Sequence, residues 1–100
     1  MIMKVTFNWD PAKSKTNYLK HGVAFQEACS VFYDQNAIEY FDTEHSSMED
    51  RFLMLGLSEK FRVLLLSYTV RKVKSAIIIR IISARKATKK ETDYYKGGLL

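Results

Sequence analysis

Three basic residues near the end of the sequence could bind a phosphate group. Arg80 interrupts an otherwise apolar segment, and Arg85 and Lys86 follow at the end of that segment. An arginine in such a segment must form an ion pair, project from a sheet edge or face a ligand. Planar guanidinium groups suit phosphate better than lysine ammonium groups do. We therefore take a phosphate site at residues 80–86 as a hypothesis; composition alone favours the alternative, an ion pair for Arg80 beside two solvated charges.

His21 is the candidate for acid–base chemistry. An imidazole is the usual group for moving the proton of a 2′-hydroxyl or of a leaving group near neutral pH. Because Gly22 follows it, the alternative is a residue that only ends a helix. His45 lies in an acidic loop and is interpreted as a surface residue.

The sequence indicates neither a metal site nor a cofactor. The two histidines, the nearby acids and the single cysteine, Cys29, show no recognised ligand spacing. Phosphate-binding glycine loops, dinucleotide fingerprints and nucleophile motifs are also lacking. Charge-driven nucleic-acid chemistry is therefore the best-supported class. Tyr94 and Tyr95, beside basic residues, could stack on RNA, the alternative being one tyrosine packed on a sheet and one in solvent.

The charge is divided unevenly along the chain. The net charge is +5, but residues 1–50 hold four lysines and eight acids, whereas residues 51–100 hold twelve Lys and Arg and three acids. The halves therefore carry −4 and +9. Such an asymmetry indicates a basic face that meets a polyanion or an acidic protein, with a merely solvated basic surface as the alternative.

Length and composition bound the class of protein. One hundred residues with 47% hydrophobic and 27% charged residues are typical of a single globular domain, here residues 1–100. The longest apolar runs, 63–66 and 76–79, are too short to span a membrane. The N-terminus lacks the apolar stretch of a signal peptide. We therefore expect a cytoplasmic protein with no membrane contact.

Hydrophobic periodicity predicts the elements that must position the candidate residues. In chain order they are a strand, two helices, four strands and a helix, at residues 4–7, 11–21, 25–32, 37–41, 51–57, 62–70, 76–84 and from 88 to the glycine pair 97–98. Asp10 and Pro11 should begin the first helix and Gly22 should end it, whereas Ala24 is a weak cap for the second. Thr88 and Glu91 form a capping-box pattern.

The connections between the predicted elements indicate the fold class. Residues 42–50 form an acidic loop, residues 58–61 a hairpin turn and residues 71–75 a basic turn. Short connections between the later strands predict an antiparallel sheet with helices on one side, which is an α+β fold.

Two blocks of residues in order resemble BrnT-type toxins. The first block is Phe7-Asn-Trp9-Asp10-Pro-Ala-Lys13, Asn17, Lys20-His21-Gly22-Val23, Phe25 and Glu27-Ala28. The match continues with Arg51-Phe52, Gly56-Leu57 and the second block, Arg80-Ile-Ile-Ser83-Ala-Arg85-Lys86-Ala87-Thr88. The sequence departs from the usual pattern at Ala24, where serine is common in the family.

The resemblance implies a toxin of a bacterial type II toxin–antitoxin system with a RelE-like fold. That fold is a small antiparallel sheet of four to five strands, packed with two N-terminal helices and a C-terminal helix. The implied activity is a metal-independent endoribonuclease that cleaves RNA and inhibits translation. The implied partner is a BrnA-type antitoxin, which forms a heterotetramer with the toxin and alone contacts operator DNA.

The resemblance also implies roles for the matching residues. Arg80 and Arg85 would hold the scissile phosphate, and His21 or Lys20 would act as general acid or base. The residues expected to guide RNA are Lys13, Arg51, Lys86, Lys89 and Tyr94. Two alternatives remain: a non-catalytic nucleic-acid-binding module and a module that binds an acidic partner through the same basic residues.

Overall fold

The computed structural model describes residues 4–47 and 49–97 and contains the predicted elements in the predicted order. They are β1 (Lys4–Asn8), α1 (Pro11–His21), α2 (Phe25–Ser30), a 3-10 turn η1 (Val31–Tyr33), β2 (Ile38–Phe41), β3 (Arg51–Leu57), β4 (Val63–Val73), β5 (Ala76–Lys86) and α3 (Lys89–Gly97). Gly98, the second residue of the predicted helix end, lies outside the described residues.

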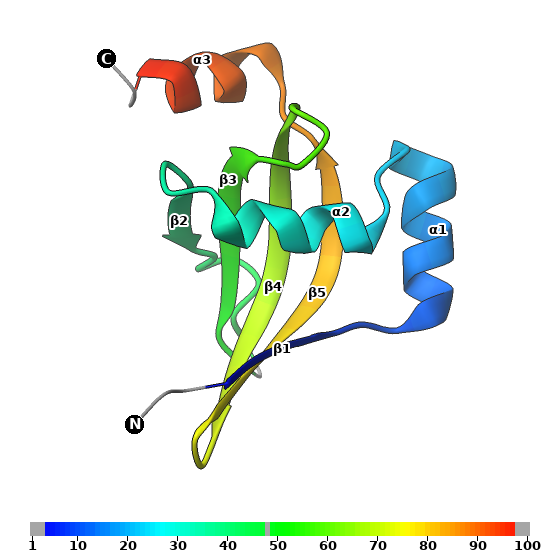
Figure 1. Ribbon diagram of the computed structural model, residues 1–100, viewed down its shortest axis with the longest axis vertical. Coiled ribbons are helices and arrows are strands. Elements are labelled where there is room, and N and C mark those ends of the chain that lie inside the picture. Colours follow the sequence, from blue (N-terminus) through cyan, green and yellow to red (C-terminus); the bar gives the residue numbers. More distant parts are fainter. Residues whose placement is uncertain (1–3, 48, 98–100) are drawn as a thin grey trace.

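All five strands form one sheet in the order β1-β5-β4-β3-β2 (Figure 1). The α+β class is confirmed, and the pairs β5–β4, β4–β3 and β3–β2 are antiparallel as expected. The sheet is nevertheless mixed, because β1 pairs parallel to β5, with Lys4 opposite Ala76 and Asn8 opposite Arg80. A parallel pair requires a long connection, and here the chain between β1 and β5 supplies the rest of the sheet.

Helix α1 begins and ends with the predicted caps. The Asp10 carboxylate accepts a hydrogen bond from the Ala12 N–H at 2.9 Å, and Pro11 occupies the first turn. Gly22 adopts the left-handed conformation, with φ of 70°, and its N–H donates to the Tyr18 carbonyl. Both ends of the helix are therefore specified by local sequence.

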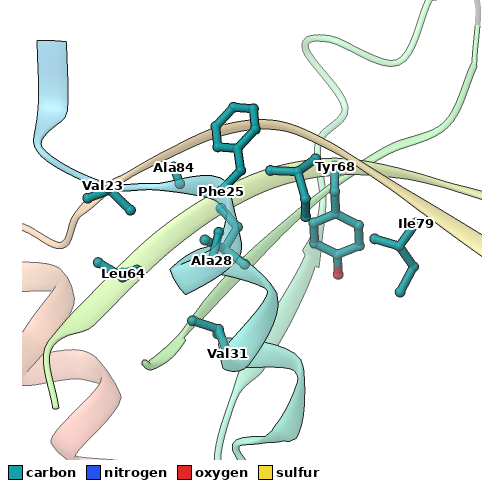
Figure 2. Packing of buried hydrophobic residues seen from close by; sticks show 10 residues of the cluster. Val23, Phe25, Ala28, Val31, Leu64, Tyr68, Ile79 and Ala84 are labelled. Atoms are coloured by element: carbon teal, nitrogen blue, oxygen red, sulfur yellow. The ribbon is translucent and has the colours of Figure 1, made fainter. Parts of the chain in front are cut away.

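Helix α2 crosses one face of the sheet and covers it (Figure 1). Phe25, Ala28 and Val31 are fully buried there, and Figure 2 shows them packed beside Leu64 and Tyr68 of β4. The expected continuous helix 25–32 is instead six residues of α-helix followed by η1. Ala24 makes no side-chain cap, so tertiary packing holds this short helix.

Helices α1 and α3 do not lie on that face, which differs from the expectation of all helices on one side. Helix α1 stands beside the sheet, next to β5, and α3 lies at one end of it (Figure 1). The predicted capping box of α3 is present: the Glu91 N–H donates to Thr88 Oγ1, and the Thr88 N–H donates to Glu91 Oε1. No helix in residues 4–47 and 49–97 is long and apolar enough to cross a bilayer.

The β4–β5 hairpin is longer than predicted. Residues 71–73, expected in a basic turn, continue β4, and β5 runs through Arg85 and Lys86. The turn shrinks to two residues, with Lys74 in the left-handed conformation at φ of 54°. The charges of residues 71 and 72 do not stop the ladder, because their backbone groups pair with Ile78 and Ile77 while the side chains stay exposed.

Candidate functional site

Alternation along the strands separates the face under α2 from a second face. Leu64, Leu66 and Tyr68 of β4 are buried under α2, so Leu65, Ser67 and Thr69 point the other way. Their partners in register extend this second face over the neighbouring strands. We call it the open face, and it carries Tyr40, Arg51, Leu53, Leu55, Leu65, Ser67, Thr69, Arg80, Ser83 and Arg85.

Two predicted arginines flank one residue on the open face. Thr69 of β4 is in register with Arg51 on β3 and with Arg80 on β5. Cross-strand partners hold their side chains on the same face, within reach of one another. Thr69 is itself 5% exposed. The structure therefore gathers Arg51 and Arg80, which lie 29 positions apart in the sequence, on the same part of the sheet.

These two arginines keep much of their hydrogen-bonding capacity. Arg80 is exposed, and its Nη1 donates to Asn8 Oδ1 at 3.3 Å, so the ion pair considered as the alternative for Arg80 is not among the ion pairs of the described residues. Arg51 Nε is buried and has no hydrogen-bond partner in residues 4–47 and 49–97. The exposed Arg80 guanidinium group could therefore donate to the oxygens of an anion, whereas Arg51 Nε could do so only if its side chain moved.

His21 and Arg85 line the same pocket, about 300 Å³ in volume, on the open face. Ser67 and Ser83, which face each other in register on β4 and β5, also line this pocket, as does Leu53 of β3. The pocket therefore combines an imidazole, a guanidinium group and two hydroxyls. Such a set can supply a proton acceptor and several hydrogen-bond donors to one small anion.

Asn17 explains why the end of α1 reaches this pocket. Its side-chain amide donates to the Ala84 carbonyl at 2.8 Å, and its Oδ1 accepts from the Ala84 N–H at 3.1 Å. The amide also donates to the Val23 carbonyl. Asn17 thus pairs with β5 as a neighbouring strand would, beyond Arg80 where β1 stops pairing, and it fixes His21 one turn later on the helix.

Lys13 and Lys20 lie on the far side of His21. With His21, Ser83 and Asn17 they line a second pocket of about 350 Å³ between α1 and β5. Because His21 and Ser83 line both pockets, the two pockets adjoin. The basic side chains of α1 therefore continue the cationic surface from the open face onto the helix.

Arg85 is held by a bidentate ion pair with Glu91 of α3. Its Nη1 and Nη2 donate to Glu91 Oε1 and Oε2 at 2.8 and 3.0 Å. The hydrogen bonds from Arg85 lower the pKa of Glu91 from its ordinary value of 4.5 to about 2, despite the opposing effect of burial. The pair therefore stays charged at neutral pH, and it fixes the plane of the Arg85 guanidinium group.

An apolar and aromatic pocket of about 390 Å³ adjoins this ion pair. Its floor is formed by Leu53, Leu55 and Leu65, and its rim by Tyr40 of β2 and by Tyr94, Lys90 and Glu91 of α3. The rings of Tyr40 and Tyr94 lie 6.5 Å apart at 33°. Only one tyrosine of the Tyr94–Tyr95 pair is exposed, as the second alternative expected. Tyr95 is packed inside and 4% exposed, whereas Tyr94 is 59% exposed at the pocket.

Two of the residues predicted to guide RNA lie away from these pockets. Lys86 is in register with Leu64, so its side chain projects on the α2 side of the sheet, opposite to Arg85. The exposed side chain of Lys89 pairs with Asp93 at 2.9 Å, one helical turn away. Because β5 extends to Lys86 rather than ending at residue 84 as predicted, the alternation of side chains along the strand decides on which face Lys86 lies.

Two carboxylates, the buried Glu27 and the half-buried Asp34, hold the surrounding elements, and the sequence patterns gave neither of them a role. Glu27 of α2 is 1% exposed and accepts hydrogen bonds from Arg62 Nε and Nη2 and from Ser58 Oγ. Arg62 also donates to the Gly22 carbonyl at the end of α1. The bond from Arg62, opposed by burial, lowers the pKa of Glu27. Glu27 lies away from the apolar positions of its helix, where a solvated acid is expected, so no local pattern signals this pair.

Asp34 is the second such carboxylate. Its Oδ2 accepts from the Leu57 N–H at 2.8 Å and from Tyr95 Oη at 2.6 Å, so it joins the end of β3 to α3. Burial and this bond to Asp34 raise the pKa of Tyr95 to about 12. The pairing depends on residues 61 positions apart and leaves no local pattern.

Neither Cys29 nor a metal cluster adds a reactive group. Burial raises the pKa of the Cys29 thiol to about 11, so the thiol stays protonated and unreactive at neutral pH. Within the described ranges, no three His, Cys, Asp or Glu side chains gather into a group that could hold a metal ion.

Fold and site together define a small α+β protein with a cationic, partly aromatic sheet face beside a histidine. The chain belongs to the family of the ribonuclease toxin, BrnT, of type II toxin–antitoxin systems, whose model matches residues 9–91. The resemblance inferred from the two sequence blocks is thereby confirmed.

A solved structure supports the fold. The chain is similar to the Brucella abortus ribonuclease toxin, BrnT, known from a crystal structure at 1.1 Å resolution. The TM-score is 0.60 and the identity is 24%, over 87% of this chain and 99% of that chain. No curated protein matches the chain.

Proposed function

We propose that the protein is a metal-independent endoribonuclease toxin whose active site is the open face. One observation carries the proposal: His21 of α1 and Arg85 of β5 line one pocket. Arg51 and Arg80, which flank Thr69 on the same face, support it. Membership of a ribonuclease toxin family supports RNA as the substrate. RNA cleavage needs a proton-transfer group next to cations that stabilise a phosphorane.

The proposed reaction uses the RNA's own 2′-hydroxyl. His21, with Lys20 beside it as the alternative, takes the 2′-hydroxyl proton while the oxygen bonds to the adjacent phosphorus. The P–O5′ bond then breaks, and the leaving oxygen takes a proton from solvent water, so that a 2′,3′-cyclic phosphate and a 5′-hydroxyl result. Arg85 and Arg80 stabilise the added negative charge of the phosphorane, while Lys13 and Arg51 hold the flanking strand.

The proposed partner is a BrnA-type antitoxin. The family belongs to type II toxin–antitoxin systems, in which a protein antitoxin neutralises the toxin. We propose that the antitoxin forms a heterotetramer with the toxin, covers the open face, and makes all contacts with operator DNA. RNA cleavage in the cytoplasm by the free toxin would inhibit translation.

The test is cleavage of labelled RNA by purified protein with EDTA present. We expect wild type to cleave, His21→Ala to lose about 100-fold or more in rate, and Arg80→Ala to lose activity as well. Lys72→Ala is the matched control, because it removes an exposed charge from β4 on the other side of the sheet.

Three results would contradict the proposal. Cleavage that stops with EDTA would contradict metal independence. RNA binding that weakens steeply with salt but yields no product would instead indicate a non-catalytic module. Unchanged RNA mobility at low salt would indicate a module for an acidic protein partner.

A further inference from the structure

The pocket formed by Tyr40, Leu53, Leu55, Leu65, Lys90, Glu91 and Tyr94 takes no part in the proposed proton transfer or phosphate binding. We call it the tyrosine pocket. We propose that the tyrosine pocket binds one unpaired nucleobase of the RNA, next to the cleaved phosphate. The inference rests on the proposed function for the position of the phosphate but not for the binding of the base.

The lining of the tyrosine pocket suits the flat face of a base. Two phenol rings at 33° to each other stand over three leucine side chains. Every base has an aromatic face, so stacking on tyrosine and contact with leucine accept any base. Tyr94 is 59% exposed, and its ring can therefore be covered by a ligand.

The position of the tyrosine pocket suits a base attached to the bound phosphate. It shares Leu53 and Leu65 with the pocket of His21 and Arg85. The ion pair of Arg85 and Glu91 joins the two, since Arg85 lines one pocket and Glu91 the other. A nucleotide with its phosphate at Arg85 thus has its base beside the leucine floor.

The charge around the tyrosine pocket also favours a nucleotide. Glu91 is the one acid among its lining residues, and the two guanidinium hydrogen bonds from Arg85 neutralise it. Lys90 remains as a cation on the rim. An aromatic platform with a cation beside it is a combination that binds single-stranded RNA. The base must be unpaired, because a base in a duplex is already stacked and its face is not available.

The test measures binding of a short, fluorescein-labelled, single-stranded RNA that is 2′-O-methylated throughout and cannot be cleaved by its own 2′-hydroxyls. A series of the same RNA lacks one base at a time. We expect one missing base to weaken binding to wild type by about 5-fold to 100-fold, the range for one stacked base. Tyr94→Ala should lose a similar factor with the intact RNA, and removal of that base should cost this variant nothing further.

The controls separate stacking from other effects. Tyr94→Phe should bind as wild type does, because a phenyl ring stacks equally well. Tyr33→Ala removes another exposed tyrosine, 79% exposed and outside the tyrosine pocket, and should bind normally. Tyr40→Ala is the second variant, expected to repeat the loss on the other ring. Annealing the RNA to its complement should abolish the contribution of the base.

The outcomes distinguish this inference from the proposed function. If wild type and variants behave as expected but unmodified RNA is not cleaved, the tyrosine pocket stands and the proposed activity falls. If Tyr94→Ala and Tyr40→Ala bind every RNA of the series as wild type does, the inference is overturned, whether or not cleavage occurs. Failure of wild type to bind RNA overturns both. Normal RNA binding by Tyr94→Ala with weaker neutralisation by the antitoxin assigns the pocket to that partner and overturns the inference.

Discussion

Gly56 of β3 lies directly against η1 and the turn that follows it. A Cβ atom at this position would stand 2.7 Å from Val31 Cγ1 and 3.0 Å from the Cβ of Ala37. Both distances are too short for carbon atoms in contact, and Val31 is fully buried and has no room to move. We therefore predict that Gly56→Ala lowers the free energy of unfolding by about 1–3 kcal/mol, as overpacking does. Urea denaturation followed by circular dichroism measures it.

Gly97 offers the matched control for that substitution. An added Cβ there meets no described atom within 4 Å, and alanine is a better helix former than glycine. Gly97→Ala should therefore keep or slightly raise the urea midpoint. Equal stability of Gly56→Ala and wild type would mean that η1 can move away from β3, and that the close approach is not required.

Local sequence predicted single residues where a neighbour in the chain is the partner. Asp10 and Gly22 cap α1, and Thr88 caps α3, because each contacts a backbone group within four positions. Glu27 and Asp34 could not be predicted in this way. Their partners Arg62 and Tyr95 lie 35 and 61 positions away, and only the folded chain brings them together.

At the scale of elements, the joint between α1 and β5 links stability to the site. Asn17→Ala removes three hydrogen bonds and leaves the N–H and carbonyl groups of Ala84 buried without their partner. We predict a loss of about 2–4 kcal/mol in the free energy of unfolding, since each buried unpaired group is costly. We also predict slower RNA cleavage, because His21 is no longer held beside Arg85.

Two measurements check the prediction for Asn17. Urea denaturation gives the stability change, and amide hydrogen exchange at Ala84 reports whether α1 has detached from β5. Lys15→Ala on the same helix is the control, because this side chain is exposed and should change neither value. Normal exchange at Ala84 in Asn17→Ala would show that packing alone holds the helix.

The existence of the elements was predictable, but their pairing was not. The alternation at Val5 and Phe7 indicated a strand without indicating its direction or its neighbour. Whether β1 pairs parallel to β5 depends on contacts between residues 4–8 and 76–80, which the spacing of apolar residues does not encode. The predicted end of β4 was wrong for a similar reason, since Arg71 and Lys72 are polar but their backbone groups pair within the sheet.

At the scale of the whole molecule, the fold brings together residues from the acidic first half and the basic second half of the sequence. The basic half supplies Arg51, Arg80 and Arg85, and the acidic half supplies His21 on α1. The sequence predicted these residue types and the resemblance predicted their roles. The sequence could not predict that Lys86 turns away from Arg85, because this follows from the register of the sheet. Nor could it predict that Tyr40 meets Tyr94, because this depends on how α3 packs against the sheet.

Three carboxylates that join distant parts of the molecule make its stability depend on acid pH. Hydrogen bonds from Arg62, opposed by burial, lower the pKa of Glu27. Burial raises the pKa of Asp34, but hydrogen bonds from Leu57 and Tyr95 outweigh it and lower the value overall. The pKa of Glu91 falls to about 2. In the unfolded chain these groups return to their ordinary values of 4.5 and 3.8.

The sign of the pH dependence follows from proton binding. Below about pH 4.5 the unfolded chain takes up protons on these carboxylates that the folded protein does not yet bind, so acid favours unfolding. We predict that the urea midpoint is nearly constant from neutral pH to about pH 5 and falls steadily towards pH 2. Glu91→Gln should flatten that fall while keeping the start of α3, because glutamine also completes a capping box. If this variant loses stability between pH 5 and pH 2 as steeply as wild type, the ion pair of Glu91 with Arg85 does not contribute to the free energy of unfolding. Arg85 could then exchange Glu91 for a phosphate without a loss of stability.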